Sequence, residues 1–569
     1  MELMILESFI HIILKNLENG GMKLPKINIS INDLKRILKM NINNEEIIDI
    51  LPKLKCEIEE IIGDRITLEV TSDRIDFFSC EGIARGIRIY YGNKWKLKEP
   101  LPESIKLFVD SSVESIRPYI VGAVIRNIEL DEEAIIQIMQ LQEKIHNTYG
   151  SNRRKASIGI YDLDKVSPPI HYSAFHPNNI KFIPLGYSEI MNGYEILSKT
   201  TKGIEYSWII KDKEKFPLLY DSNNIVLSMP PIINSENTKV TTDTRNLFID
   251  ITGTDENTIN TCLNVIVTSI LERGGDFQYV DIYYHNKIER TPKLNYTTTS
   301  LKLSTINNSL GININLSDII SFLNKMGHEV KEVNDNEIIV LSPPYRVDIL
   351  HEIDLVEDIT MAIGLENIKP EIPRITTIGR LLKESKIRRI IRDIMIGMGF
   401  QEVITYMLSS KSVMEDKSLL EKREFVELIN PVSSEYEVLR DCLLPKLLQF
   451  LSYNIHEPYP QKIFEYGDVV YVENGIAKVS THLAAAISDY KVSYEDIQAV
   501  VVALFKALSK NISFKPYNKL PFIEGRAAEI ILDGKSIGIV GEISPRVLVN
   551  FGLEFPVGIF ECDIIKFIF

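Results

Sequence analysis

Cysteine is scarce in this chain, and its spacing excludes two kinds of small domain. The 569 residues include five cysteines, an odd number, and no two of them form a CxxC pair. The sequence therefore encodes neither a disulfide framework nor a zinc ribbon. Thiols that serve as small core residues fit a reducing compartment, so we expect a cytoplasmic protein. The five positions are Cys56, Cys80, Cys262, Cys442 and Cys562.

Long apolar runs are also absent. No stretch approaches the roughly 20 apolar residues of a membrane-spanning helix, so we expect no membrane partner. The segment before Met22 lacks a basic leader and contains Glu7, which argues against a signal peptide. Two explanations stay open for residues 1–21: an extra helix, or a start codon placed too early.

Glycine-rich nucleotide motifs are missing as well. The segment "DGKS", residues 533–536, lacks the glycine that a phosphate-binding loop carries five residues earlier, and no GxGxxG occurs. The formal net charge of −14 argues against a nucleic-acid-binding protein of the usual basic kind. It leaves room for local basic patches, or for a partner subunit that carries the phosphate contacts.

Short strands and helices alternate along the chain, a pattern typical of a multidomain α+β protein. After the first 21 residues, we expect domains at 22–98, 99–290, 291–373 and 374–569. The second of these should be built around a mostly antiparallel sheet. The third is small, with a helix, a strand pair and then an acidic stretch.

The acidic stretch "PPYRVDILHEIDLVEDITMAIG", residues 343–364, places five carboxylates within eleven residues. The two prolines stop the preceding strand, and a helix is expected to begin near His351. At roughly 100° per residue, Asp354, Glu357 and Asp358 fall within about a 100° arc of that helix. Asp348 could reach them from the turn before it.

Carboxylates this close repel one another unless a positive group offsets them. Neither Lys nor Arg occurs from residue 348 to residue 366, and Mg²⁺ prefers oxygen ligands of this kind. The alternative is a solvated acidic face, which the dipole at a helix N-terminus also favours. Spacing alone leaves both interpretations open.

This stretch resembles the magnesium-binding domain of phenylalanyl-tRNA synthetase β subunits. That family's motif has an aspartate, a second aspartate six residues later and then an adjacent acidic pair. Its positions here are Asp348, Asp354, Glu357 and Asp358, while Glu352 lies outside it. The resemblance implies a Mg²⁺ site at the junction with an α subunit.

Further motifs follow in the family's order. "LEVTSDRIDFFSCEGIARGIRIYYG" is similar to its N-terminal domain, and "SIGIYDLDK", "LSMPPIINSENTKVT" and "FIDITGTD" resemble its editing domain in the archaeal and eukaryotic branch. "NPVSSEYEVLRDCLLPKLLQFLSYN", "IFEYGDVV" and "FIEGRAAEIILDGKSIGIVGEISPRVL" resemble its class II synthetase-like, antiparallel-sheet core. That core has no convincing third-motif arginine, so the resemblance implies a catalytically inactive copy of the fold. "VLRD" could equally be a loop that enters an amphipathic helix.

The resemblance implies an α₂β₂ tetramer that charges tRNA(Phe) with phenylalanine, using ATP and Mg²⁺. It also implies that this chain hydrolyses mischarged Tyr-tRNA(Phe), because a hydrophobic pocket rejects an added hydroxyl only weakly. We take Ser228, Asp250 and Thr252 as candidate catalytic residues for editing, with Asn234 and Ser235 as further polar candidates. Each could instead be a turn or capping residue.

Two other functions stay open beside this one. A free-standing editing hydrolase would be active without a partner, whereas a purely structural tRNA-binding subunit would carry an inactive editing pocket. The basic residues Arg153, Arg154 and Lys155 follow a predicted helix that ends at Gly150. On an exposed loop they could contact the tRNA backbone, and a solvated loop explains them equally well.

Overall fold

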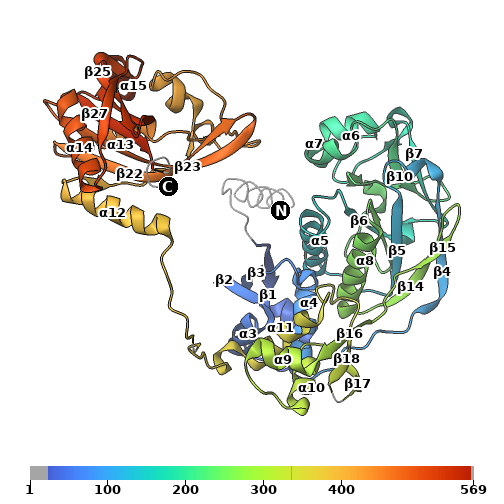
Figure 1. Ribbon diagram of the computed structural model, residues 1–569. Helices are drawn as coiled ribbons and strands as arrows, with labels where there is room; N and C mark the ends of the chain where they lie inside the picture. The colour runs from blue at the N-terminus through green and yellow to red at the C-terminus, as the bar shows by residue number, and fades with distance from the viewer. Residues whose placement is uncertain (1–23, 335, 374, 565–569) are drawn as a thin grey trace. The chain divides into compact units, whose positions relative to one another are not determined.

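The computed structural model describes residues 24–334, 336–373 and 375–564 (Figure 1). The predicted extension, residues 1–21, lies outside these. Contacts between Cα atoms divide the chain into two compact units, one built on residues 21–372 and the other on residues 373–569. Among the helices of the described ranges, none is both long and apolar enough to cross a membrane.

The first region of the larger unit is a three-stranded antiparallel sheet packed against helices. Its strand order is β1 (Lys26–Ser30), β3 (Arg65–Val70), β2 (Cys56–Ile62). The helices are α2 (Ile31–Leu38), α3 (Asn44–Ile50) and α4 (Cys80–Tyr90). Gly63 joins β2 to β3 at φ +58°, in the left-handed region that favours glycine, so the two strands are connected by a tight turn.

A ten-stranded, mostly antiparallel sheet forms the second region, as the sequence predicts. Its path is β12-β11-β10-β7-β4-β14-β5-β13-β6, with β15 paired to β14. Only the pairs of β4 with β14 and with β7 are parallel. The strands are β4 (Leu101–Val109), β5 (Tyr119–Arg126), β6 (Ala156–Asp162), β7 (Ile170–Phe175), β10 (Phe216–Tyr220), β11 (Val226–Met229), β12 (Ile233–Asn234), β13 (Leu247–Gly253), β14 (Asp276–Tyr283) and β15 (Ile288–Thr291).

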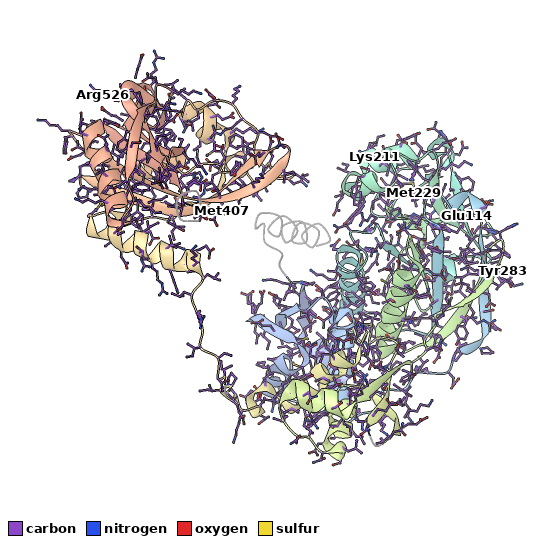
Figure 2. All side chains as sticks on the ribbon, viewed as in Figure 1. Glu114, Lys211, Met229, Tyr283, Met407 and Arg526 are labelled. Atoms are coloured by element: carbon purple, nitrogen blue, oxygen red, sulfur yellow. The ribbon has the colours of Figure 1, made fainter. Side chains whose placement is uncertain are left out.

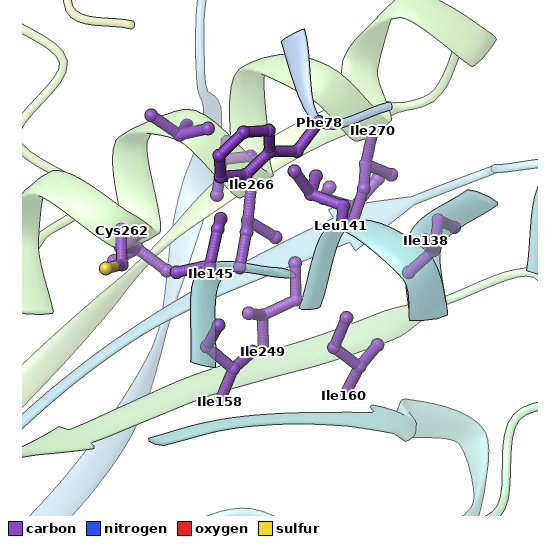
Figure 3. Close-up of a cluster of buried hydrophobic side chains, with 14 of the residues drawn as sticks. Phe78, Ile138, Leu141, Ile145, Ile158, Ile160, Ile249, Cys262, Ile266 and Ile270 are labelled. Carbon is purple, nitrogen blue, oxygen red and sulfur yellow. The ribbon is translucent and has the colours of Figure 1, made fainter. Parts of the chain in front are cut away.

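Helices α5 (Glu132–Asn147) and α8 (Glu256–Ile270) cover one face of this sheet. Figure 3 shows Ile138, Leu141 and Ile145 of α5 beside Cys262, Ile266 and Ile270 of α8, above Ile158, Ile160 and Ile249 of the sheet. Phe78 from the first region enters the same buried cluster. The boundary predicted after residue 98 therefore crosses a continuous hydrophobic core. Two short helices, α6 (Gly193–Lys199) and α7 (Thr201–Tyr206), and the strand pair β8 (Lys181–Phe182) and β9 (Met191–Asn192) complete the region.

The third region has a three-stranded sheet and a small core of its own. The sheet order is β16 (Thr297–Lys302), β18 (Glu337–Ser342), β17 (Glu329–Val333), and the helices are α9 (Leu303–Leu310), α10 (Leu316–Lys325) and α11 (Glu352–Ile363). His351 is the N-cap of α11, which confirms the predicted start of the acidic helix.

The smaller unit is organised around a seven-stranded sheet in which only β19 and β22 pair in parallel. Its order is β19 (Gln401–Glu402), β22 (Gln461–Glu473), β23 (Ile476–Ser488), β27 (Val557–Asp563), β26 (Lys535–Ile543), β25 (Phe522–Leu532), β24 (Ile512–Pro516). Helices α12 (Lys383–Gly397) and α14 (Tyr494–Ala507) share one core with it, and α13 (Leu444–Tyr453) and α15 (Pro545–Phe551) share another. The short strands β20 (Leu408–Ser409) and β21 (Val438–Leu439) form a separate pair.

Residues of β23 alternate between these two cores. Leu483 and Ala485 lie in the cluster with α12 and α14, whereas Ala484 and Ala486 lie in the cluster with α13 and α15. Successive side chains of a strand point to opposite faces of its sheet, so helices cover both faces here. A mostly antiparallel sheet therefore forms the core of the smaller unit, within residues 375–564.

Candidate functional site

Asp250 lies in the middle of β13, where the sheet makes room for a carboxylate. Its cross-strand partners are Gly122 on β5 and Gly159 on β6, so neither neighbour places a side chain against it. A Cβ atom on Gly159 would lie 2.4 Å from Asp250 Oδ1 and 2.0 Å from the Tyr161 hydroxyl. Glycine at position 159 is therefore needed for these two groups to meet.

A buried phenol joins two of the predicted editing residues. The Tyr161 hydroxyl donates to Asp250 Oδ1 at 2.5 Å and lies 2.8 Å from Ser228 Oγ. Ser228 comes from β11, just before Met229, which Figure 2 labels. All three side chains are buried, and the Tyr161 ring stacks on Phe248 with ring centroids 5.8 Å apart. Ser228 and Asp250, from two different strands, therefore both contact the hydroxyl oxygen of Tyr161.

The environment of Asp250 changes its acidity. Burial raises the pKa of Asp250 to about 7, although the hydrogen bond from Tyr161 and the charge of Arg117 act in the opposite direction. Burial and the adjacent Asp250 raise the pKa of Tyr161 well above its usual range. Near neutral pH the Asp250 carboxyl can therefore accept or donate a proton, while Tyr161 keeps its own.

Thr252, the third predicted residue, faces a different partner. Its Oγ1 accepts from Arg117 Nε at 2.8 Å, and its carbonyl oxygen accepts from Arg117 Nη2 at 2.6 Å. The Arg117 guanidinium also binds the carbonyl oxygens of Arg153 and Arg154, and burial lowers its pKa to about 10. Thr252 therefore binds a buried cation whose charge acts on Asp250, and it does not join the Tyr161 contacts.

Two further polar candidates have structural roles. Ser235 caps the short turn Glu236–Thr238, where its Oγ accepts from the Asn237 amide at 3.3 Å. Asn234 pairs with Ser228 across β11 and β12. The turn and capping explanation that the sequence left open holds for Ser235.

The basic residues after Gly150 are not all exposed. Arg153 is buried: it donates to the Ile232 carbonyl oxygen at 2.8 Å and to Glu143 at 2.6 Å, and it lies over the Tyr206 ring. The prediction of an exposed basic loop is therefore wrong for this residue, because Glu143 and two backbone carbonyls draw it inward. Arg154 and Lys155 are exposed.

The four carboxylates of the predicted magnesium site bind protein groups. Arg346 donates to Asp348 at 3.0 and 2.7 Å and to Asp358 at 2.6 Å. The ring of His328 lies 2.6 Å from the same Asp358 oxygen. Burial would raise the pKa values of both carboxyls, but the Arg346 charge holds each below its usual range.

The other two carboxylates face elsewhere. Asp354 Oδ2 accepts from the amides of Leu350 and His351, as a capping group does, and Glu357 forms an ion pair with Lys55 at 2.8 Å. Asp358 is buried on the core side of α11, whereas Glu357 is exposed. Asp348 and Asp358 meet at Arg346, whereas Asp354 and Glu357 contact other groups. No group of three or more acidic, His or Cys side chains within residues 24–334, 336–373 and 375–564 is placed to hold a metal ion. The contacts do not fit a Mg²⁺ site, which stays a prediction.

Comparison with known proteins connects these regions. The sequence matches the descriptions "B3/4 domain" over residues 118–282, "tRNA synthetase B5 domain" over 299–365 and "Phenylalanyl tRNA synthetase beta chain CLM domain" over 368–564. The phenylalanine--tRNA ligase beta subunit of Archaeoglobus fulgidus is 38% identical over 549 residues, covering 96% of this chain and 99% of that protein. That of Pyrococcus furiosus is 40% identical, covering 95% and 99%. The chain belongs to the family of phenylalanine--tRNA ligase beta subunits.

A solved structure supports the same family. An N-terminal fragment of the Pyrococcus horikoshii phenylalanyl-tRNA synthetase β subunit is 40% identical, with a TM-score of 0.58, and the match covers 60% of this chain and all of the fragment. In this beta subunit, Ser228, Asp250 and Thr252 lie in the segment that matches the "B3/4 domain", and the acidic helix lies in the segment that matches the "B5 domain".

Two residues of this beta subunit's buried site could not be predicted from the sequence. Tyr161 lies inside the segment "SIGIYDLDK", yet nothing in its spacing marks it as the partner of Asp250. Arg117 stands before a proline with no motif around it. Both act through contacts between segments far apart in the chain, and periodicity along one segment contains no signal for them.

Arg440, in the segment "VLRD", is also bound internally. It is buried between β21 and α13, where it donates to Glu465 at 2.6 Å and to the Asp468 carbonyl oxygen at 2.9 Å. Its Nη1 also donates to Thr405 Oγ1 at 2.7 Å. An arginine held in this way has few donors left for a ligand.

Proposed function

We propose that this beta subunit assists an α subunit in attaching phenylalanine to tRNA(Phe) and itself hydrolyses Tyr-tRNA(Phe). The observation that carries the editing role is the binding of a phenol by Asp250 and Ser228. That phenol belongs to Tyr161, and it has the same chemistry as the side chain that distinguishes tyrosine from phenylalanine. A tyrosyl group that took its place would find the same two partners.

Discrimination then follows from burial. A carboxyl group that accepts a hydrogen bond from the tyrosyl hydroxyl would be left without a partner by phenylalanine, and a buried unpaired polar group is costly. A site built to bind a hydroxyl rejects the analogue that lacks it strongly, by roughly 10⁴-fold in favourable cases. Phe-tRNA(Phe) would therefore escape hydrolysis.

The synthetic reaction is assigned to the α subunit of an α₂β₂ tetramer. The internal contacts of Arg440 support a seven-stranded core that is catalytically inactive, since this arginine is held by Glu465 and Thr405. ATP, phenylalanine and Mg²⁺ would then bind to the α subunit. The magnesium site at Asp348, Asp354, Glu357 and Asp358 is no part of this proposal, because protein groups already bind all four carboxylates.

The test is deacylation of Tyr-tRNA(Phe) by the complex of both subunits. We expect wild type to clear the tyrosyl-tRNA and Asp250→Asn to slow hydrolysis by roughly 100-fold or more, since it removes the titrating group. Asp243→Asn, an exposed aspartate of the same region, is the matched control and should behave as wild type. Synthesis of Phe-tRNA(Phe) should be equal in all three.

A structural subunit with an inactive pocket is the second candidate. One observation favours it: Tyr161 occupies both polar partners, and the side chains of Ser228, Asp250 and Thr252 are buried. Under that alternative, the complex forms Phe-tRNA(Phe) but neither wild type nor Asp250→Asn clears Tyr-tRNA(Phe). A chain that hydrolyses the ester equally well without its partner would instead be a free-standing editing hydrolase.

A further inference from the structure

A basic cavity lies between the first two regions of the larger unit, and none of the editing residues lines it. Its volume is about 320 Å³, and its walls come from α4, from the connecting segment 93–98 and from the end of α8 and the turn after it. Glu272 is the single carboxylate in its lining. The cationic residues of the lining are Arg85, Arg88, Lys94, Lys96 and Lys98. The chain has a formal net charge of −14, so a cluster of five cationic residues around one cavity needs an explanation.

Arg85 is the least satisfied of these groups. The residue is 1% exposed, and none of its three guanidinium nitrogens has a hydrogen-bond acceptor in the described part of the chain. The nearest carboxylate oxygens, on Asp76 and Glu272, lie 3.7 and 3.6 Å away, which is too long for a hydrogen bond. The Tyr345 ring covers one face of the guanidinium, 3.8 Å from its centroid.

Buried donors of this kind are rare, because an unpaired polar group in the interior costs free energy. Both nearby carboxylates have closer partners, since Glu272 forms an ion pair with Arg88 and Asp76 forms one with Arg74. Arg85 also lines a second void, with Arg74, Asp76 and Tyr345, which measures about 10 Å³ and has room for one water at most. The 320 Å³ cavity is the larger space beside these donors.

The entrance of the cavity is positively charged. Lys94 and Lys96 are exposed and have no ion-pair partner within residues 24–334, 336–373 and 375–564, while Lys98 lies 3.4 Å from Asp276. The lining also includes the apolar side chains of Trp95, Leu97 and Leu271. A ligand that combines an anionic group with a flat or apolar portion could contact both the cationic residues and the apolar wall.

We propose that this cavity binds a nucleotide phosphate, with Arg85 beneath the phosphate oxygens and Lys94 and Lys96 at the entrance. Phosphate oxygens accept several hydrogen bonds from a guanidinium, and the neighbouring apolar wall fits a base or ribose. A volume of this size lies in the range of small-molecule pockets. The phosphate belongs either to a free nucleotide or to an RNA strand. The inference is independent of the editing role.

Tryptophan fluorescence gives a direct test, because the chain has only two tryptophans and one of them lines the cavity. Trp208→Phe removes the other, which lies outside the cavity lining. The full-length Trp208→Phe chain is titrated with inorganic phosphate, with AMP and with a short RNA at constant ionic strength, and calorimetry runs in parallel. We expect a saturable change in Trp95 emission and heat of binding with at least one of them.

Variants locate the binding. Arg85→Gln should weaken it by roughly 10-fold or more, because charge-assisted hydrogen bonds are lost, and Lys94→Gln with Lys96→Gln by about two- to fivefold. Lys211→Gln with Lys213→Gln removes the same charge at the same spacing from an exposed segment of the ten-stranded-sheet region and should change nothing (Lys211 is labelled in Figure 2). If Arg85→Gln does not fold, judged by circular dichroism, the lysine pair against its control decides.

The outcomes separate the two sources and allow refutation. Tighter binding of AMP than of RNA identifies free nucleotides, and the reverse identifies the RNA backbone. Absence of saturable binding for all three probes overturns the proposal. So does equal weakening by both lysine pairs, since that would reflect charge in general. Loss of editing by Asp250→Asn leaves each of these results unaffected.

Discussion

At the scale of single residues, the most unusual group is a carboxyl that keeps its proton to near-neutral pH. Asp250 is 1% exposed in the middle of a sheet, and the closest group that donates to it is a neutral phenol. Arg117 contributes its charge from a distance but spends its hydrogen bonds on Thr252 and backbone carbonyls. Burial therefore outweighs both, and the carboxylate form is disfavoured in the folded chain.

This has a consequence for stability that a pH series can detect. The pKa of Asp250 rises from its ordinary 3.8 to about 7 on folding, so between these values the folded chain binds a proton that the unfolded chain has released. The contribution of Asp250 to stability is thus most favourable below about pH 4. It falls as the pH rises, by on the order of 4 kcal/mol in total at pH 7 and above. Asp250→Asn, which cannot ionise, should have a melting temperature that exceeds that of wild type by more at pH 8 than at pH 5.

The control for this series is Asp243→Asn, because Asp243 is exposed in the same region and its removal changes the formal charge equally. Its difference from wild type should not vary between pH 5 and pH 8. A constant difference for Asp250→Asn across the same range would show that Asp250 is ionised throughout, and the raised pKa would then be wrong.

At the scale of elements, the acidic helix α11 shows how distant segments neutralise a charged motif. The absence of Lys and Arg from residue 348 to residue 366 suggested a cation. The positive groups come instead from Arg346 just before that window and from Lys55 in the first region, and the buried ring of His328, before β17, also contacts Asp358. Because Lys55 pairs with Glu357, the motif also fastens the third region to the first.

Replacing Arg346 tests whether these contacts hold the helix. Arg346→Met would leave Asp348 and Asp358 as buried charges without their main partner, at a cost of about 3–5 kcal/mol. Lys55→Met would break a pair in which the Glu357 side chain is 58% exposed, at a cost below about 1 kcal/mol. Chemical denaturation of both variants measures the difference.

The effect of Mg²⁺ on stability tests whether protein groups or a metal ion neutralise the acidic helix. Addition of MgCl₂ or EDTA to the wild-type chain should leave its denaturation midpoint unchanged, because protein groups bind all four carboxylates. A midpoint raised by MgCl₂ and restored by EDTA, with loss of the effect in Asp354→Asn, would support the family's metal site in place of this network.

Local features of α11 could be predicted from sequence, and its environment could not. The helix start at His351 and the strand pair before it follow from prolines, capping residues and periodicity, which act within a few residues. The direction of Asp358 depends on Arg346 and His328, which reach it from other segments. The same limit applies to Arg153, which Glu143 and the carbonyl of Ile232 draw into the interior.

The buried site, too, could be predicted from the sequence only in part. Ser228 and Asp250 were found because their motifs resemble an editing domain, and the structure joins them. The joining atom, the Tyr161 hydroxyl, depends on the register of β6 with β13 and on the lack of a side chain at Gly159. Register is a property of the assembled sheet, so no single segment reveals it.

At the scale of the whole molecule, the chain consists of two units that should fold separately. Their contacts divide at residues 372 and 373, and each unit has its own hydrophobic cores. The solved fragment from Pyrococcus horikoshii, whose whole length matches 60% of this chain, shows that an N-terminal part of a relative exists on its own. The connecting segment is rich in exposed apolar residues, with Ile372 93% and Ile378 91% exposed.

Limited proteolysis should therefore cut this segment before it cuts either unit. Among residues 368–382, the described positions contain no helix or strand, so a protease can bind the backbone there in extended form. Lys369 precedes a proline, which resists trypsin, whereas Arg380 is exposed and precedes Leu381. Arg374 precedes Ile375 and is a second tryptic site in this segment. We expect the first tryptic cut of the isolated chain after Arg374 or Arg380, identified by mass spectrometry of two stable fragments. Replacing both sites, Arg374→Gln with Arg380→Gln, should delay the appearance of the fragments, while a first cut within the ten-stranded or the seven-stranded sheet would show that the two units do not fold independently.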